Sequence, residues 1–215
     1  MEKKIKNFWD DDKNSRIAHR AERFKLSNKK GQENINLLNK SMLNQIKFKD
    51  KILIDYGIGS GFVGHYLLKE KELKKYIGYD ISVKSIKVAQ EEIGEYNNQA
   101  EFMIVEGQDY TFDKWGADIF LSLACIQHFP TYEYLENFLQ QLESSNIPII
   151  ALQIRYDQYT KFRVKPYENS IDAVQACHTN NNFILSILKS YRLIYNTEPS
   201  KRSKYQYLLY DRSKA

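Results

Sequence analysis

The sequence predicts an α/β fold in which helices cover both faces of a mostly parallel sheet. Between residues 51 and 156, short apolar runs alternate with longer stretches whose apolar residues recur at helical spacing. This alternation is typical of parallel strands joined by crossover helices. It ends at residues 191–198 and 205–212, two strand-like runs joined by a short polar turn. These runs predict a hairpin, and therefore an antiparallel edge of the sheet.

Size and composition limit the kinds of protein that this chain can be. At 215 residues and 42% hydrophobic content, it can bury the core of one domain with an appendage. No apolar run reaches the roughly 18 residues of a membrane helix, and no apolar stretch follows the charged N-terminus as in a signal peptide. Basic and acidic residues are interspersed at a net charge of +5, which favours a solvated surface over a nucleic-acid track. Cys125 and Cys177 are too few for a disulfide framework or a zinc site, so we expect a reducing cytoplasm.

Residues 1–45 are predicted to form a helical arm in front of the main domain. Residues 1–30 are polar and charged with a few apolar anchors, and a helix is expected near Ser15–Phe24. Apolar residues at helical spacing from Ile35 to Ile46 predict a second helix.

Five strands and their helices are predicted to follow the arm. The strands are expected at residues 51–56, 76–80, 101–105, 117–124 and 147–156. Helices are expected from Phe62, after Ser82 as N-cap, near Thr131, and around Asn181–Ser190.

Three glycines, Gly57, Gly59 and Gly61, form a G-x-G-x-G motif directly after the first predicted strand and before a helix. Glycine there lets the chain turn sharply and lets a ligand approach the backbone. No Gly-Lys-Ser/Thr follows, which excludes a nucleoside-triphosphate loop. The dinucleotide fingerprint requires a glycine where Phe62 stands, although Gly64 leaves a pyrophosphate site open.

Two acids lie at the ends of successive predicted strands. Asp55 precedes the first glycine by two residues, and Asp80 follows Gly61 by 19 residues. An acid at the second position can accept hydrogen bonds from both ribose hydroxyls of an adenosine. The alternative is that both acids only cap the loops that follow.

Four motifs in this order resemble those of the class I S-adenosylmethionine-dependent methyltransferases, in particular the small-molecule branch. They are "ILIDYGIGSG", "IGYDIS", "VEGQDYTF" and "DIFLSLACIQHFP", and the resemblance covers residues 51 to 156. It implies a Rossmann-like, seven-stranded, mostly parallel sheet with an antiparallel last strand. It also implies S-adenosylmethionine as the methyl donor and a methyltransferase domain at residues 46–215.

The resemblance implies roles for individual residues in binding the methyl donor. The three glycines pass under its methionyl and ribose parts, Asp55 meets the ammonium side, and Asp80 holds the ribose hydroxyls. The remaining contacts are Ile81 against the adenine face, Asp109 with its neighbour Gln108 at the adenine amino group, and the carbonyls of Leu123 and Ala124 at the ammonium. An ordinary turn acid at Asp109 and a plain core residue at Ile81 are the alternatives.

His128, at the end of the fourth predicted strand, is the candidate general base if the acceptor is a hydroxyl. Open α/β sheets bind ligands at this end of their strands, and histidine accepts protons near neutral pH. The alternative is a histidine that caps the helix starting near Thr131. Gln127 is a weaker polar contact in the same loop.

The stretch after the fifth predicted strand, residues 153–167, is rich in arginine and tyrosine and is interpreted as a lid over the acceptor. Arg155, Tyr156 and Arg163 are the predicted acceptor contacts, since arginine can bind a carboxylate, phosphate or sugar-acid group. In the arm, Trp9 is a further candidate contact or a simple hydrophobic anchor. For each single residue, a solvated charged loop is the alternative.

Several functions stay open at this point. The preferred one is methyl transfer to an oxygen or nitrogen of a small polar, possibly anionic or sugar-like, acceptor. An RNA or protein methyltransferase is an alternative, but the fourth strand end has no Asn/Asp-Pro-Pro-aromatic or Pro-Cys signature. A non-catalytic S-adenosylmethionine-binding subunit and, more weakly, a nicotinamide-linked reductase complete the set. Oligomeric state is open, with residues 205–210 as a sheet edge or a dimer seam.

Overall fold

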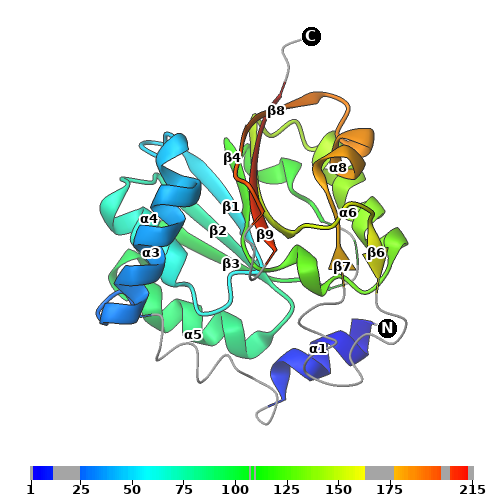
Figure 1. Ribbon diagram of the computed structural model, residues 1–215. Helices are drawn as coiled ribbons and strands as arrows, with labels where there is room; N and C mark the ends of the chain where they lie inside the picture. Colours follow the sequence, from blue (N-terminus) through cyan, green and yellow to red (C-terminus); the bar gives the residue numbers. More distant parts are fainter. Residues whose placement is uncertain are drawn as a thin grey trace. The chain divides into compact units, whose positions relative to one another are not determined.

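The structure, a computed structural model, describes residues 2–11, 25–106, 108, 110–162, 177–199 and 204–212 (Figure 1). The helix predicted near Ser15–Phe24 and the predicted site residues Asp109 and Arg163 lie outside these ranges. The chain divides into two compact units, residues 1–107 (unit 1) and residues 108–215 (unit 2).

Seven strands form one sheet, in the order β3-β2-β1-β4-β5-β9-β8. Their bounds are Ala100–Ile104 (β3), Lys75–Asp80 (β2), Ile52–Tyr56 (β1), Ile119–Ser122 (β4), Ile149–Arg155 (β5), Tyr205–Arg212 (β9) and Tyr191–Asn196 (β8). β1 and β3 both pair in parallel with β2, and β4 pairs in parallel with β5. β9 is antiparallel to β5 and to β8. The predicted Rossmann-like sheet with an antiparallel last strand is confirmed.

The predicted hairpin does form an antiparallel edge of the sheet, but its last strand, β9, is the inner of its two strands. β9 runs between β5 and β8, so β8 is the edge strand. Leu208, Leu209 and Tyr210 of β9 are buried, as the residues of an inner strand are. Residues 205–210 are therefore neither a sheet edge nor a free seam for a second copy.

In unit 1, α4 (Phe62–Glu70) and α5 (Val83–Ile93) pack against β2, and α3 (Lys29–Ser41) packs against α4. Apolar side chains from these helices and from β1 and β2 are fully buried: Leu53, Ile54, Leu67, Ile77, Ala89 and Ile93. The helix predicted from Ile35 to Ile46 is two elements, because α3 ends at Ser41 and the 3₁₀ turn η1 (Leu43–Gln45) follows. A helix that was not predicted, α1 (Glu2–Asp10), also packs against α5.

Ser82 caps α5 as predicted, because its hydroxyl accepts a hydrogen bond from the Ser85 N–H at 3.1 Å. This cap starts α5 immediately after β2 ends at Asp80. The helix N-terminus therefore lies directly beside the strand end that carries the predicted ribose-binding acid.

In unit 2, α6 (Tyr132–Ser144) packs against α8 (Asn181–Ile187). The core beneath α6 is aromatic, with neighbouring ring centroids 5.0 to 6.2 Å apart, and contains Phe112, Phe120, Phe129 and Phe138. A separate two-stranded sheet, β6 (Lys161–Phe162) and β7 (Cys177–His178), was not predicted. Short 3₁₀ turns η2 (Gly94–Gln99), η3 (Asp113–Trp115) and η4 (Ile126–His128) complete the two units.

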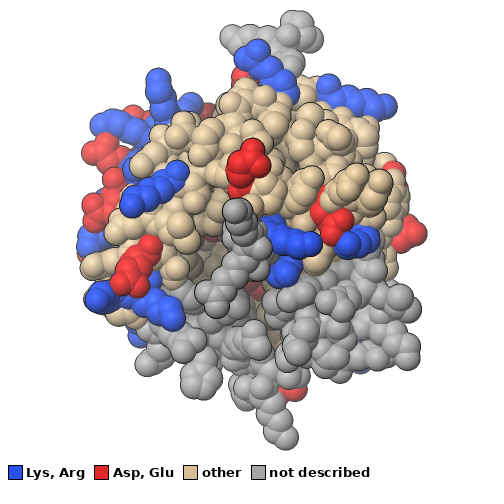
Figure 2. All heavy atoms as spheres, viewed as in Figure 1, with Lys and Arg blue, Asp and Glu red and all other residues tan. Residues whose placement is uncertain are grey.

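Charged side chains of both signs are interspersed on the visible face in Figure 2. This distribution agrees with the scattered pattern of the sequence. Within the described ranges, no helix is both long and apolar enough to cross a membrane.

Candidate active site

The glycine loop after β1 uses its glycines for two different purposes. Gly61, at φ 78°, precedes α4, and a Cβ there would lie 2.7 Å from the Cβ of Ala89 on α5. Gly59, at φ 55°, has open space where a Cβ would be. Gly61 therefore lets the loop pack closely against α5, whereas Gly59 leaves backbone accessible to a ligand.

Asp80 lies at the end of β2 with both carboxylate oxygens hydrogen-bonded to the backbone. The Gly59 N–H donates to one oxygen at 3.0 Å, and the Ser82 N–H donates to the other at 2.9 Å. Burial raises the pKa of Asp80 to about 6; the two N–H donors lower this pKa, and the charge of Asp10 raises it further. The residue is 9% exposed. The carboxylate is therefore held in a fixed orientation beside the glycine loop.

Asp55, in β1, is bonded to a neighbouring strand. The Tyr76 hydroxyl donates to its carboxylate at 2.9 Å, and both side chains are buried. Burial raises the pKa of Asp55 to about 7, opposed by the Tyr76 hydrogen bond and supported by the charge of Asp80. A Cβ at Gly64 would lie 2.5 Å from the Tyr76 ring, so this glycine makes room for the tyrosine. The contact predicted between Asp55 and the ammonium group stays a prediction.

The N-terminal helix α1 reaches the same strand end. The Ser82 hydroxyl donates to the Asp10 carboxylate at 2.7 Å and lies 3.5 Å from the Trp9 carbonyl oxygen. The half-buried Trp9 ring packs edge-on against Phe8, with centroids 5.2 Å apart. The backbone of the predicted site residue Trp9 therefore lies close to Ser82. Asp10 was not predicted, because a single acid in a charged arm forms no recognisable pattern.

In unit 2, the loop after β4 has an unusual backbone. Ala124 adopts φ 51°, and its N–H donates to the side-chain oxygen of Gln153 on β5 at 3.0 Å. Residues other than glycine rarely adopt positive φ, and such strain gathers at functional sites. The loop that carries the predicted residues Leu123 and Ala124 is thus held in one conformation.

Gln108 is tied to α6 by two hydrogen bonds. Its side-chain oxygen accepts from the Asn137 amide at 2.8 Å, and its backbone carbonyl accepts from the Gln141 amide. Gln141 also accepts from the Tyr110 N–H at 2.8 Å. These bonds fix Gln108, the predicted neighbour of the adenine contact, against α6.

Gln127 and His128 lie in η4, directly after the β4 loop. Gln127 is 3% exposed, and its amide donates to the Tyr205 hydroxyl at 3.1 Å. The half-buried His128 does not cap α6, because the Thr131 hydroxyl accepts the Tyr134 N–H at 3.2 Å and fills that role. The alternative interpretation of His128 as the cap is therefore wrong.

The carboxyl end of β5 brings together residues that are far apart in the sequence. The Arg155 guanidinium lies 5.9 Å from the Tyr205 ring centroid, and the Tyr156 N–H donates to the Lys204 carbonyl at 2.8 Å. β7 packs against both β5 and η4, which places His178 in this neighbourhood. Sequence reasoning missed His178, since its segment has no periodicity and its position depends on long-range pairing.

Comparison with known proteins relates this geometry to a family. Residues 53–145 match a family model described as a methyltransferase domain. The whole chain is similar to magnesium protoporphyrin IX methyltransferase from Synechocystis PCC 6803 with bound S-adenosylhomocysteine, at TM-score 0.69 and 16% identity over 99% of both chains. Residues 53–145 of this chain are therefore a methyltransferase domain, and the chain has the fold of the class I S-adenosylmethionine-dependent methyltransferases. The matched residues contain the glycine loop, Asp80 and η4.

Other solved structures share the fold of this methyltransferase. Phosphoethanolamine N-methyltransferase 2 from Haemonchus contortus, in complex with phosphomonomethylethanolamine and S-adenosylhomocysteine, has a TM-score of 0.68 and 14% identity. That match covers 98% of this chain and 61% of the other. An S-adenosylmethionine-dependent methyltransferase from Listeria monocytogenes, putative in its description, has a TM-score of 0.63 and 14% identity over 86% and 99% of the two chains. A comparison with curated protein sequences gives no match.

The residues of unit 1 fit the adenosyl part of S-adenosylmethionine. Each oxygen of the Asp80 carboxylate accepts one backbone N–H and retains lone-pair capacity for a ribose hydroxyl. The open space at Gly59 leaves backbone that a ligand can approach. When bound, the donor supplies an electrophilic methyl group on its sulfonium. The tasks left to the chain are to bind and orient the acceptor and, where the acceptor is a hydroxyl, to take its proton.

Proposed function

We propose that this methyltransferase binds S-adenosylmethionine at the glycine loop of unit 1 and methylates a small polar acceptor. The single observation that carries the proposal is Asp80, a buried carboxylate fixed by Gly59 and Ser82 N–H groups at the end of β2. In the proposal, Asp80 accepts both ribose hydroxyls. Gly57, Gly59 and Gly61 run beneath the methionyl and ribose parts, with Ile81 against the adenine.

The remaining contacts in the proposal are assigned to Asp55 and to the segments that carry Gln108 and Leu123. The fixed backbone of Leu123 and Ala124 offers carbonyl oxygens to the ammonium group, and Gln108 flanks the adenine amino group. Asp55 acts on the ammonium side. These assignments follow the motif pattern and are supported by the held conformations of the two loops.

The proposed acceptor is a small molecule with a polar, anionic part, methylated on oxygen or nitrogen. Gln127, Arg155 and Tyr156 gather at the β4 and β5 ends, and cationic side chains there suit a carboxylate or phosphate. The descriptions of two similar proteins support a small acceptor. One is a magnesium protoporphyrin IX methyltransferase, and the other was solved with phosphomonomethylethanolamine. Arg163, outside the described residues, and Trp9 remain candidate contacts, and His128 a candidate base.

Calorimetric titration with S-adenosylmethionine tests the cofactor site. Wild-type protein should bind, and Asp80→Asn should weaken binding about 10- to 100-fold, because hydrogen bonds to a charged group contribute about 1.5–3 kcal/mol. Glu91→Gln, an exposed acid on α5, is the matched control and should bind like wild type. Melting curves check that each variant is folded. Equal affinity of Asp80→Asn and wild type would contradict the ribose assignment.

A screen for consumption of the methyl donor tests the acceptor class. Polar metabolites, sugar nucleotides and phosphorylated compounds are incubated with the protein, and S-adenosylhomocysteine is measured. Turnover with an anionic hydroxyl or amine compound is the expected result. Turnover confined to RNA or protein substrates would overturn the proposal of a small acceptor.

A further inference from the structure

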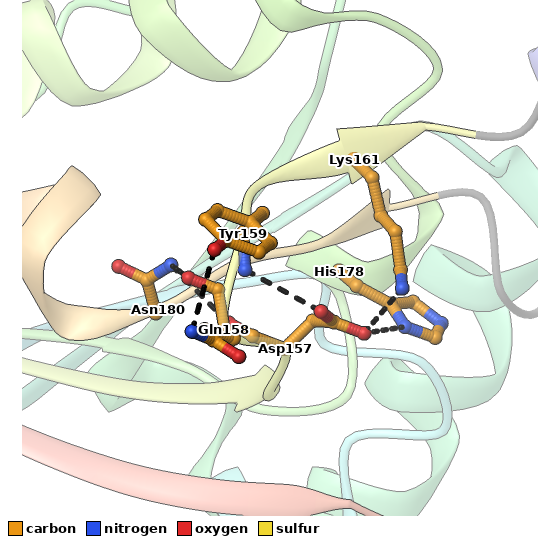
Figure 3. Close-up of polar contacts among 6 residues, drawn as sticks. All are labelled: Asp157, Gln158, Tyr159, Lys161, His178 and Asn180. Atoms are coloured by element: carbon orange, nitrogen blue, oxygen red, sulfur yellow. Dashed lines mark hydrogen bonds and ion pairs between the residues drawn. The ribbon is translucent and has the colours of Figure 1, made fainter.

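A polar cluster at the carboxyl end of β5 joins Asp157 to His178 (Figure 3). The Thr179 N–H donates to the Arg155 carbonyl at 2.9 Å, and the Asp157 N–H donates to the Thr179 carbonyl at 3.0 Å. These two backbone bonds fix β7 alongside the segment that leaves β5. His178, next to Thr179, is therefore held beside Asp157 by the main chain.

The Asp157 carboxylate faces two basic side chains. One of its oxygens lies 2.5 Å from the Lys161 Nζ and 3.8 Å from the His178 Nδ1, while its other oxygen accepts the Tyr159 N–H at 3.4 Å. The Asn180 amide donates to the carbonyls of Asp157 and Gln158 at 3.2 and 2.9 Å. Figure 3 shows Lys161 and His178 converging on the same side of the carboxylate. Contacts at both oxygens therefore orient the Asp157 carboxylate.

The surroundings of His178 favour a neutral imidazole. Burial lowers the pKa of His178, the charges of Arg155, Lys161 and Lys204 lower it further, and Asp157 opposes them. η4, which carries His128, also packs against β7. In the tautomer with Nδ1–H on the side of the Asp157 carboxylate, which lies 3.8 Å away and is not hydrogen-bonded to it, the lone pair is on Nε2. That nitrogen can accept a proton near neutral pH.

Three buried polar atoms in this neighbourhood have no hydrogen-bond partner among the described residues. They are the Gln127 Oε1, the Arg155 Nε and the His178 Nδ1. η4 packs against both β5 and β7, so the three side chains come from adjoining elements. A buried polar atom without a partner destabilises the folded chain, and a ligand with matching groups removes that cost. The matching ligand has an anionic group for the arginine and a hydroxyl for the amide oxygen.

We propose that His178, positioned by Asp157, is the proton acceptor for the hydroxyl of an anionic acceptor that Arg155 binds. The inference rests on the proposed methyl transfer and names its base and its acceptor class. The acceptor oxygen forms a bond to the methyl carbon, and the bond between that carbon and the donor sulfur breaks with its electron pair going to sulfur. The hydroxyl proton passes to the Nε2 of His178, which later releases it to water.

Histidine resonances test the site without knowledge of the acceptor. The chain has four histidines, so ¹³C-labelled imidazoles can be assigned by single substitution. The His178 pKa should fall in Asp157→Asn and rise in Lys161→Met, because these changes remove an anion and a cation respectively. Inorganic phosphate at millimolar concentration should raise the His178 pKa in wild type and leave it unchanged in Arg155→Gln. His65, paired with Glu92 in unit 1, is the internal control. A His178 pKa that none of these changes moves would overturn the proposal.

Turnover with the acceptor found by the consumption screen tests the catalytic step. His178→Asn and His178→Gln should lower kcat about 10²- to 10⁴-fold while binding S-adenosylmethionine like wild type. His65→Asn is the control. Asp157→Asn should move the acidic limb of the kcat profile to lower pH, and Asp157→Glu should restore part of it. Wild-type kcat in both His178 variants would overturn the base assignment. Failure of wild type to bind the methyl donor would instead overturn the proposed function.

Discussion

At the glycine loop of unit 1, the two buried carboxylates both have hydrogen-bond donors: Asp80 accepts two backbone N–H groups, and Asp55 accepts the Tyr76 hydroxyl. At the carboxyl end of β5 in unit 2, buried polar atoms of Gln127 and Arg155 have no partner in the described part of the chain. The two carboxylates of the first region are thus paired within the protein, whereas these two polar atoms of the second region are not paired within the described residues. A site for a constant methyl donor can be preorganised, whereas polar atoms for a particular acceptor stay unpaired until it binds.

The closely packed glycine loop should tolerate change least. Gly61→Ala places a Cβ 2.7 Å from the Ala89 Cβ at a residue with φ 78°. Overpacking and the left-handed conformation together should lower the free energy of unfolding by about 2–5 kcal/mol, measured by urea titration.

Gly116→Ala is the matched control for this loop. Gly116 also adopts the left-handed conformation, at φ 56° and ψ 39°, but has open space around its Cβ position. It should cost only about 1–2 kcal/mol, since only the backbone conformation is penalised. Equal costs at the two glycines would show that the loop is not closely packed against α5.

The buried Asp55 should make stability fall as pH rises. Its folded pKa of about 7 lies above its ordinary value of 3.8. The folded state therefore holds the proton more tightly, and stability present below about pH 4 is lost progressively up to about pH 7. Asp55→Asn keeps an acceptor for the Tyr76 hydroxyl and should exceed wild-type stability by about 2–3 kcal/mol at pH 8, with little difference at pH 4.

Glu91→Gln, at an exposed position of the same unit, should leave the pH profile of unfolding unchanged. Denaturant titrations of the three proteins at both pH values make the comparison. If Asp55→Asn gains nothing at pH 8, the carboxylate is not held charged in a buried setting. The comparison between the two regions would then rest on Asp80 alone among the acids of unit 1.

The same contrast explains which features the sequence could predict. Strands β1 and β2, the glycine loop and the Ser82 cap depend on neighbours in the chain, so apolar periodicity and cap chemistry locate them. Asp80 could be singled out because its place at a strand end is local.

The features that were missed depend on contacts between distant segments. β9 enters the sheet between β5 and β8, and no local pattern shows where a hairpin inserts. His178 reaches Asp157 only because the Thr179 N–H bonds to the Arg155 carbonyl across 24 residues of chain. The bond from the Tyr76 hydroxyl to Asp55 likewise joins two strands, so neither strand's sequence alone predicts it.

The smallest expected effect is at Gln127. Gln127→Met removes the side-chain amide. Within the described ranges, the amide oxygen has no hydrogen-bond partner, and the amide nitrogen donates to the Tyr205 hydroxyl. Losing one hydrogen bond while relieving one unpaired oxygen should change the free energy of unfolding by less than about 1 kcal/mol.

Gln153→Met provides the sharper half of this test, because both glutamines are buried in unit 2 and only their pairing differs. The Gln153 oxygen accepts the Ala124 N–H and holds the strained β4 loop, so its loss should cost about 1–3 kcal/mol. Urea titrations at one pH compare the two variants. A larger cost at Gln127 than at Gln153 would mean that the amide oxygen of Gln127 is satisfied within the folded chain. The carboxyl end of β5 would then be completed internally, like the glycine loop, and would not need an acceptor to pair its polar atoms.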